Sequence, residues 1–147
     1  MTVPWEILIV SAELEDRLAL ARILEAHDLE ALCVPTLREA QEALRKETVG
    51  LVFCEKNLPD GTYRDLLAAG RTLKTRVRVV VTSRQADWDE YLVAMRLGAF
   101  DVIASPCRPT DVEWMVIQAK RDERNQIRQQ EVDPAFTYRH AAAGTVS

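Results

Sequence analysis

An apolar run that stops at a single acidic residue constrains the fold of this chain most. Residues Leu51 to Cys54 are apolar, Glu55 follows them, and the turn sequence Pro59-Asp60-Gly61 comes a few positions later. Such a run, bounded by turn signals, predicts a buried parallel strand that leads into a loop. Because open α/β sheets bind ligands outside the carboxyl ends of their strands, Glu55 stands where a site is expected.

Strand-like segments of this kind alternate with helical patterns along the whole chain. The strands are expected at residues 6–10, 31–34, 51–55, 77–82 and 101–104. The helices are expected at residues 14–27, 36–47, 62–73, 87–97 and 109–130. This alternation with short loops predicts an α/β fold, a doubly wound (βα)5 architecture whose five-stranded parallel sheet carries helices on both faces.

Particular residues indicate where the helices begin, end and bury their faces. Thr36 with Glu39, and Thr62 with Asp65, form capping pairs at two helix starts. Gly98 is placed to end the fourth helix. In the first helix, apolar residues recur at helical spacing and predict its apolar face: Leu14, Leu18, Ala21 and Leu24, with their neighbours Leu20 and Ile23.

The composition favours one soluble globular domain. The 147 residues carry a formal net charge of -4, which argues against nucleic acid as the main ligand because phosphate binding needs a basic patch. No apolar run approaches the roughly 20 residues of a membrane span, and no secretory signal precedes the first strand. Cys33, Cys54 and Cys107 lack metal-like spacing, so we expect reduced, buried thiols in a cytoplasmic protein.

The chain becomes polar after Ile117. We therefore expect a compact domain at residues 1–121 and, at residues 122–147, a polar extension of the last helix with a C-terminal tail. Mixed charges between Lys120 and Gln130 favour a solvated helix, with a sparse coiled-coil seam as the alternative. Asp133-Pro134 should break this helix, and residues 136–147 are expected to form a mobile tail.

Short loops follow four of the five expected strands, and their residues, most of them polar, should meet at one edge of the sheet. They are Ser11, Ala12 and Glu13 after the first strand, Glu55 and Asn57 after the third, Thr82 and Ser83 after the fourth, and Ser105 after the fifth. A site built from these side chains is therefore predicted at that edge.

The order and spacing of several short segments resemble the receiver domain of two-component response regulators. These segments are Asn57-Leu58-Pro59-Asp60-Gly61, Val81-Thr82-Ser83, Leu97-Gly98-Ala99-Phe100-Asp101, and Ser105-Pro106 with Pro109. The resemblance covers about Trp5 to Arg121. It implies the flavodoxin-like receiver fold, with strand order 2-1-3-4-5, and a role in bacterial-type phosphorelay signalling rather than an enzyme activity.

In the family that this chain resembles, an acidic pair helps to hold Mg²⁺ and an aspartate accepts a phosphoryl group. The metal and a lysine neutralise charge on the transferring oxygens. Matched position by position, the acidic pair falls on Ser11 and Ala12, the acceptor on Glu55, the lysine on Ser105, the hydroxyl on Thr82 and a metal-facing carbonyl on Asn57. Glu13 lies one residue past the pair. The resemblance thus implies a degenerate receiver domain with no cofactor and with weak or absent Mg²⁺ binding.

Two interpretations of Glu55 remain open. Glutamate is one methylene longer than aspartate, so Glu55 could imitate the phosphorylated state by bonding Thr82. Alternatively, it is a solvated or ion-paired carboxylate with Lys56 or Arg84 in reach. The second interpretation is favoured because Val102, at the family's aromatic switch position, is too small to swing as an aromatic residue does.

Two further functions also stay open: a phosphoacceptor with unusual site geometry, and a small-ligand sensor that uses the same pocket. Enzyme chemistry is poorly supported. The chain has no Gly-x-Ser-x-Gly elbow, Walker A loop or Gly-x-Gly-x-x-Gly motif. Neither His27 nor His140 follows a predicted strand.

Aromatic residues on the fourth and last helices predict a protein-binding surface. Trp88, Tyr91 and Met95 are spaced to share one helix face, although Tyr91 and Met95 also suit packing on the sheet. Trp114 points away from the apolar stripe of the last helix. Receiver domains dimerise or bind partners through the fourth helix, the fifth strand with Val102, and the last helix. A homodimer, or a partner such as a histidine kinase or output protein, is therefore expected here, without nucleic acid or membrane.

Overall fold

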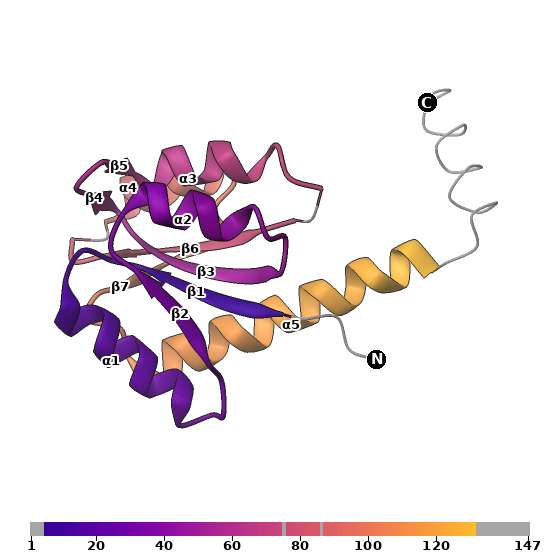
Figure 1. Ribbon diagram of the computed structural model, residues 1–147, viewed down its shortest axis with the longest axis horizontal. Helices are drawn as coiled ribbons and strands as arrows, with labels where there is room; N and C mark the ends of the chain where they lie inside the picture. The colour runs from indigo at the N-terminus through magenta and orange to yellow at the C-terminus, as the bar shows by residue number, and fades with distance from the viewer. Residues whose placement is uncertain (1–4, 75, 86, 132–147) are drawn as a thin grey trace.

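The computed structural model describes residues 5–74, 76–85 and 87–131. Asp133, Pro134, His140 and the expected tail lie outside these residues. A five-stranded parallel sheet lies between two layers of helices (Figure 1). Its strands run in the order β2-β1-β3-β6-β7, which is the expected order 2-1-3-4-5 when only these five are numbered along the chain. The predicted α/β fold is confirmed.

The elements lie close to their predicted positions. The sheet strands are β1 Glu6–Val10, β2 Ala31–Val34, β3 Val49–Glu55, β6 Arg78–Ser83 and β7 Asp101–Ala104. The helices are α1 Leu14–Glu25, α2 Leu37–Leu44, α3 Tyr63–Gly70, α4 Trp88–Arg96 and α5 Pro109–Glu131. Two short strands not foreseen from the sequence, β4 Asn57–Leu58 and β5 Gly61–Thr62, pair around the Pro59-Asp60 turn.

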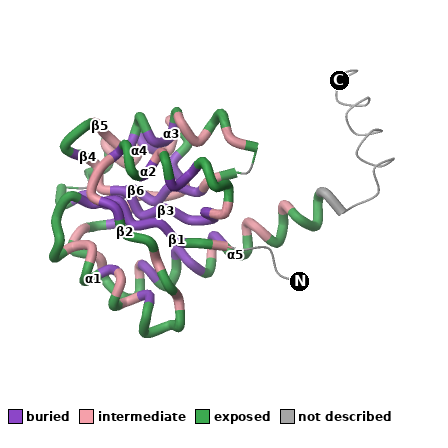
Figure 2. The backbone as a smooth tube through the Cα atoms, viewed as in Figure 1, coloured by how far each residue is buried: buried purple, intermediate pink, exposed green. Residues whose placement is uncertain are grey.

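The central strand β3 shows why its sequence is apolar at successive positions. Leu51 and Phe53 belong to the core beneath α1 and α5, whereas Val52 and Cys54 belong to the core beneath α2, α3 and α4. Side chains alternate between the two faces of a strand, and here helices cover both. Figure 2 shows the resulting buried layer between exposed outer helix surfaces.

The buried face of α1 differs from the predicted one. Leu20 and Leu24 are buried, but Leu14 is 58% exposed and Leu18 is 45% exposed. Each residue turns an α-helix by about 100°, so Leu18 and Leu20 point in nearly opposite directions. Packing of Leu20 and Leu24 on the sheet therefore leaves Leu14 and Leu18 facing outward, and the expected apolar stripe is wrong at these two positions.

The helix starts carry the predicted caps, with one addition from across the chain. Thr62 and Asp65 form a complete capping box at α3, and the Thr36 hydroxyl accepts a hydrogen bond from the Glu39 backbone N–H at α2. The α2 start has a second cap, because the Asp60 carboxylate accepts the backbone N–H groups of Leu37 and Arg38 at 2.8 and 3.0 Å. These bonds favour the ionised carboxylate and lower the Asp60 pKa.

A glycine ends α4 where the sequence predicts it. Gly98 has a φ of +102°, a left-handed conformation that favours glycine because it has no Cβ. The backbone N–H of Gly98 bonds the carbonyl of Met95, and the N–H of Ala99 bonds that of Ala94. These bonds close the helix and turn the chain into β7.

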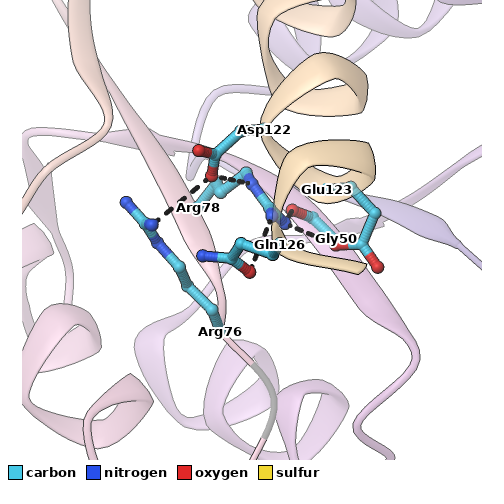
Figure 3. Close-up of polar contacts among 6 residues, drawn as sticks. All are labelled: Gly50, Arg76, Arg78, Asp122, Glu123 and Gln126. Carbon is cyan, nitrogen blue, oxygen red and sulfur yellow. Dashed lines mark hydrogen bonds and ion pairs between the residues drawn. The ribbon is translucent and has the colours of Figure 1, made fainter. Parts of the chain in front are cut away.

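A buried arginine ties β6 to the second half of α5 (Figure 3). The Arg78 side chain is 0% exposed. Its Nε donates to Asp122 Oδ2 at 2.7 Å, its Nη1 lies 3.0 Å from Glu123 Oε2, and its Nη2 donates to Gln126 Oε1 at 3.3 Å. Nη1 also donates to the Gly50 carbonyl at 3.4 Å. A guanidinium withdrawn from water needs such partners.

The contacts of Arg78 show that the α5 extension is less solvated than expected. Asp122, Glu123 and Gln126 were expected on a solvated helix, but each is half-buried and contacts Arg78. The expectation is wrong for these three residues, because the buried guanidinium on β6 holds their side chains against the sheet. A domain boundary at residue 121 remains a prediction.

Candidate functional site

The carboxyl ends of β3, β6 and β7 border an open pocket of about 260 Å³. It is lined by Glu55, Lys56, Asn57, Thr82, Ser83, Arg84, Gln85 and Ser105. Glu55 and Thr82 are direct neighbours in the sheet register, and the Ser105 backbone N–H bonds the Ser83 carbonyl at 2.9 Å. Parallel strands thus bring together side chains that are up to 50 positions apart in the sequence numbering.

The Glu55 carboxylate is held by the loop that follows β1. The Ser11 hydroxyl donates to Glu55 Oε2 at 2.9 Å, and the Ala12 backbone N–H donates to the same oxygen at 3.2 Å. Ser11 is buried and its Oγ also accepts the Glu13 backbone N–H at 3.2 Å. The carboxylate is therefore directed to the β1 loop by hydroxyl and amide donors.

Among the residues that the structure describes, Glu55 forms no ion pair with Lys56 or Arg84, so the ion-paired form of the favoured interpretation is wrong. The Lys56 ammonium pairs with Glu90 on α4, and Arg84 Nη2 lies 2.9 Å from Asp16 Oδ2 on α1. The Asp16 carboxylate also raises the pKa of Arg84. Each cation adjacent to Glu55 in sequence or space therefore has a closer acidic partner on a neighbouring helix. Among the described hydrogen bonds, Glu55 does not reach Thr82.

The donor set at this edge does not fit the Mg²⁺ ion that the resemblance implies. Mg²⁺ demands an octahedral shell of oxygen ligands anchored by carboxylates. Ser11 and Ala12 bring no carboxylate, and the Glu55 oxygen that faces them already accepts two hydrogen bonds. Within residues 5–74, 76–85 and 87–131, no three His, Cys, Asp or Glu side chains gather as a metal site.

A polar cluster that the sequence did not suggest links the site to α4. Glu90 receives the Lys56 ammonium on one carboxylate oxygen and the Ser83 hydroxyl, at 3.3 Å, on the other. Lys56 is the first residue after β3, so the contact with Glu90 begins directly at the end of this strand. No sequence pattern marks the cluster, because Lys56 and Glu90 lie 34 positions apart.

Lys56 and Ser83 also border a second cavity, of about 180 Å³, between α3 and α4. Its apolar walls include Tyr63, Val81, Ala94 and Val102. Val102 is half-buried there, at the position where the family resemblance places an aromatic switch. The site and α4 are thus joined by Glu90 and not by a large residue on β7.

Comparison with known families agrees with this fold. A family model described as the response regulator receiver domain matches residues 7–117. The chain belongs to the response regulator receiver domain family. It is therefore a signalling module of the two-component type.

Curated relatives are similar to this receiver domain over part of their length. The hydrogenase transcriptional regulatory protein HoxA of Bradyrhizobium diazoefficiens is 27% identical over 120 residues, which cover 81% of this chain and 24% of that protein. The regulatory protein LuxO of Vibrio cholerae is 29% identical over 111 residues, or 73% of this chain and 24% of that protein. The chain spans about a quarter of the length of both relatives.

Solved receiver domains share the fold. A response regulator receiver domain protein from Clostridium thermocellum has a TM-score of 0.76 at 19% identity, covering 82% of this chain and 98% of that chain. The beryllofluoride-activated NtrC4 receiver domain dimer has a TM-score of 0.74 at 20% identity, covering 80% and 97%. At these identities the likeness concerns the fold alone.

The residues expected at a protein-binding surface lie on α4, β7 and α5 of this receiver domain. Trp88 is 70% exposed and stacks on Tyr91, with ring centroids 5.6 Å apart. Trp114 is 52% exposed. Tyr91, Met95 and Val102 are half-buried. Both tryptophans therefore stand in solvent, so neither is part of the core of this chain.

The three thiols differ in environment. Cys54 is buried beneath α2 and α3, and burial with the nearby Glu55 charge raises its pKa to about 12. Burial raises the Cys107 pKa to about 11. Cys33 is exposed, which corrects the expectation that it is buried. The strand β2 that carries it pairs on one side only, with β1.

None of the helices within the described ranges combines the length and the apolar composition that a membrane crossing requires. The longest, α5, has 23 residues but is rich in charged side chains.

Proposed function

We propose that this chain is a degenerate receiver domain that signals by protein contact and does not accept a phosphoryl group at Glu55. One observation supports this most. The positions that match the family's acidic pair, Ser11 and Ala12, instead donate hydrogen bonds to the carboxylate at the acceptor position. Neither position brings a carboxylate that could help to hold a metal ion, and both direct a hydrogen-bond donor at Glu55.

Charge at the rest of the edge supports the same proposal. Phosphoryl transfer depends on cations that neutralise the transferring oxygens. The family's lysine position is Ser105, a neutral residue, and Lys56 is already paired with Glu90. A phosphoryl group beside Glu55 would therefore meet a negative charge with little compensation.

The proposed output is a protein-binding surface on α4, β7 and α5. It comprises Trp88, Tyr91, Met95, Val102 and Trp114. Exposed tryptophans are common anchors of protein interfaces. The partner is a second copy, a histidine kinase or an output protein of a cytoplasmic signalling pathway, and the surface needs neither nucleic acid nor a membrane.

Incubation with acetyl phosphate and Mg²⁺, followed by intact-mass spectrometry, tests the proposal. The unmodified chain should show no stable gain of one phosphoryl group. A matched control combines Ser11→Asp, Ala12→Asp, Glu55→Asp and Ser105→Lys, which restores the family's acidic pair, acceptor and lysine. This control should gain the mass.

A stable phosphoryl gain on the unmodified chain would show that the site is a competent acceptor of unusual geometry. Tryptophan fluorescence during a titration with beryllofluoride and Mg²⁺ gives a second readout. The control variant should respond and the unmodified chain should not.

A further inference from the structure

Buried Arg78 orients the acidic side chains of the α5 extension toward the sheet. In sequence, acidic and basic residues are mixed between Lys120 and Arg128. In the structure, both acidic residues of this segment turn toward β6: Asp122 contacts Arg78 and Arg76, and Glu123 contacts Arg78 (Figure 3). Their charges are therefore offset within the domain and are not presented by the outer face of the helix.

The outer face of α5 keeps its arginines. Arg121, Arg124 and Arg128 are all exposed. They continue the line of the exposed residues Trp114 and Ile117, because steps of three and four residues keep side chains on one helix face. From Trp114 to Arg128 this α5 stripe is about 21 Å long at 1.5 Å per residue. Its apolar end lies in the first half of α5 and its cationic end in the second half, which Figure 1 shows running beyond the sheet.

We propose that the α5 stripe binds a helical segment of a partner protein that carries apolar residues followed by several Asp or Glu side chains. The three arginines supply charge complementarity for such a segment, and Trp114 with Ile117 supplies apolar contact. Arginine and tryptophan are both enriched at protein interfaces.

A nucleic acid is a poorer fit for the same stripe. Its apolar end offers no cation to a phosphate backbone, and the chain carries a net charge of -4 with an isoelectric point near 5.3. Domains that bind nucleic acid through charge are usually strongly basic. The proposal rests on the proposed function only in taking the partner to be a protein.

Calorimetric titration of the full chain with synthetic peptides tests the stripe. The probe is a helical peptide with leucine at every third or fourth position of its first half and glutamate throughout its second half. The unmodified chain should bind this peptide, and binding should weaken with salt. Arg121→Glu with Arg124→Glu should weaken it by about tenfold or more, and the same variant should prefer a peptide in which lysine replaces glutamate.

The matched control is Arg38→Glu with Lys46→Glu, which changes the net charge equally on the exposed surface around α2. This control should bind as the unmodified chain does. Trp114→Ala should weaken binding while leaving its salt dependence unchanged.

Three results would overturn the proposal: no binding of the acidic peptide, equal losses in both charge-reversed variants, or tighter binding of a mixed-sequence DNA duplex. None of these results depends on whether the chain gains a phosphoryl group in the mass measurement. The two experiments therefore test the peptide-binding proposal and the proposed function separately.

Discussion

Glu55 illustrates how far a single residue is defined by its sequence position. The apolar run before it placed the carboxylate at the sheet edge, as the structure shows. Lys56 and Arg84 are the cations nearby that the sequence offers as ion partners, and neither pairs with Glu55 among the described residues. Lys56 pairs instead with Glu90 on α4, and Arg84 pairs with Asp16 on α1. The Ser11 hydroxyl donates a hydrogen bond to Glu55. Local sequence predicts which residues reach an edge, but not which of them pair.

Asp60 offers a test at the same scale. Its pKa is lowered by the α2 backbone N–H groups. A carboxylate with a lower pKa in the folded chain stabilises the fold at neutral pH, and this contribution is lost as the pH falls through the folded pKa. Asp60→Ala should therefore lower Tm at pH 7, and the difference should shrink below about pH 4.

Glu30→Ala, which removes an exposed carboxylate from a loop, is the control for the change in net charge. Thermal unfolding followed by circular dichroism between pH 7 and the acid limit gives the comparison. A Tm difference that stays constant over this range would show that Asp60 does not act through its charge.

At the scale of elements, the two halves of α5 contact the domain in different ways. Its first half was predicted correctly as a core helix, and Val112, Met115, Val116 and Ala119 are buried. Its second half was predicted to be solvated because its residues are polar. The sequence does not show that Arg78 is buried, and this buried charge attracts the polar side chains of α5 toward the sheet. Polar residues on a helix can therefore be expected in solvent only where the sheet strands beneath the helix carry no buried charge.

The Arg78 cluster makes a quantitative prediction for the stability of these elements. Asp122→Ala with Glu123→Ala leaves a buried guanidinium without its carboxylates. The free energy of unfolding should fall by about 3 kcal/mol, the lower end for an uncompensated buried charge, because both carboxylates are partly exposed and water can replace them in part. Urea denaturation measures this change.

Adding Arg78→Met to the double variant should recover most of the loss, because an apolar side chain of similar length removes the buried charge. Arg124→Ala, on the outer face, should change stability by no more than about 0.5 kcal/mol. If Arg78→Met deepens the loss, then Arg78 stabilises the fold through packing and not through its carboxylate partners.

In the whole molecule, polar residues gather at the carboxyl ends of β3, β6 and β7, and the exposed aromatic residues lie on α4 and α5. Glu90 connects the two, since it lies on α4 between Trp88 and Tyr91 in sequence and contacts Lys56 and Ser83 at the edge. Glu90 thus links the polar edge to the α4, β7 and α5 surface that we propose as the output of this domain.

If that surface forms a homodimer, light scattering of the unmodified chain should show a mass that rises with concentration. Trp88→Ala with Trp114→Ala should weaken the dimer by about 2 kcal/mol or more, roughly thirtyfold in the dissociation constant. Leu14→Ala with Leu18→Ala removes exposed apolar residues from α1 and should leave the dimer unchanged. An unmodified chain that stays monomeric would assign the surface to another protein.

The amino-acid sequence alone was enough to predict the order of strands and helices, the capped starts of α2 and α3, the end of α4 and the position of Glu55. These features depend on periodicity and on hydrogen bonds within a few residues, which the chain carries locally. Tertiary packing was needed to establish the partners of Glu55 and Lys56, the exposure of Leu14 and Cys33, and the inward orientation of Asp122 and Glu123. Each charged side chain has several candidate partners along the chain, and the packing of distant elements selects among them.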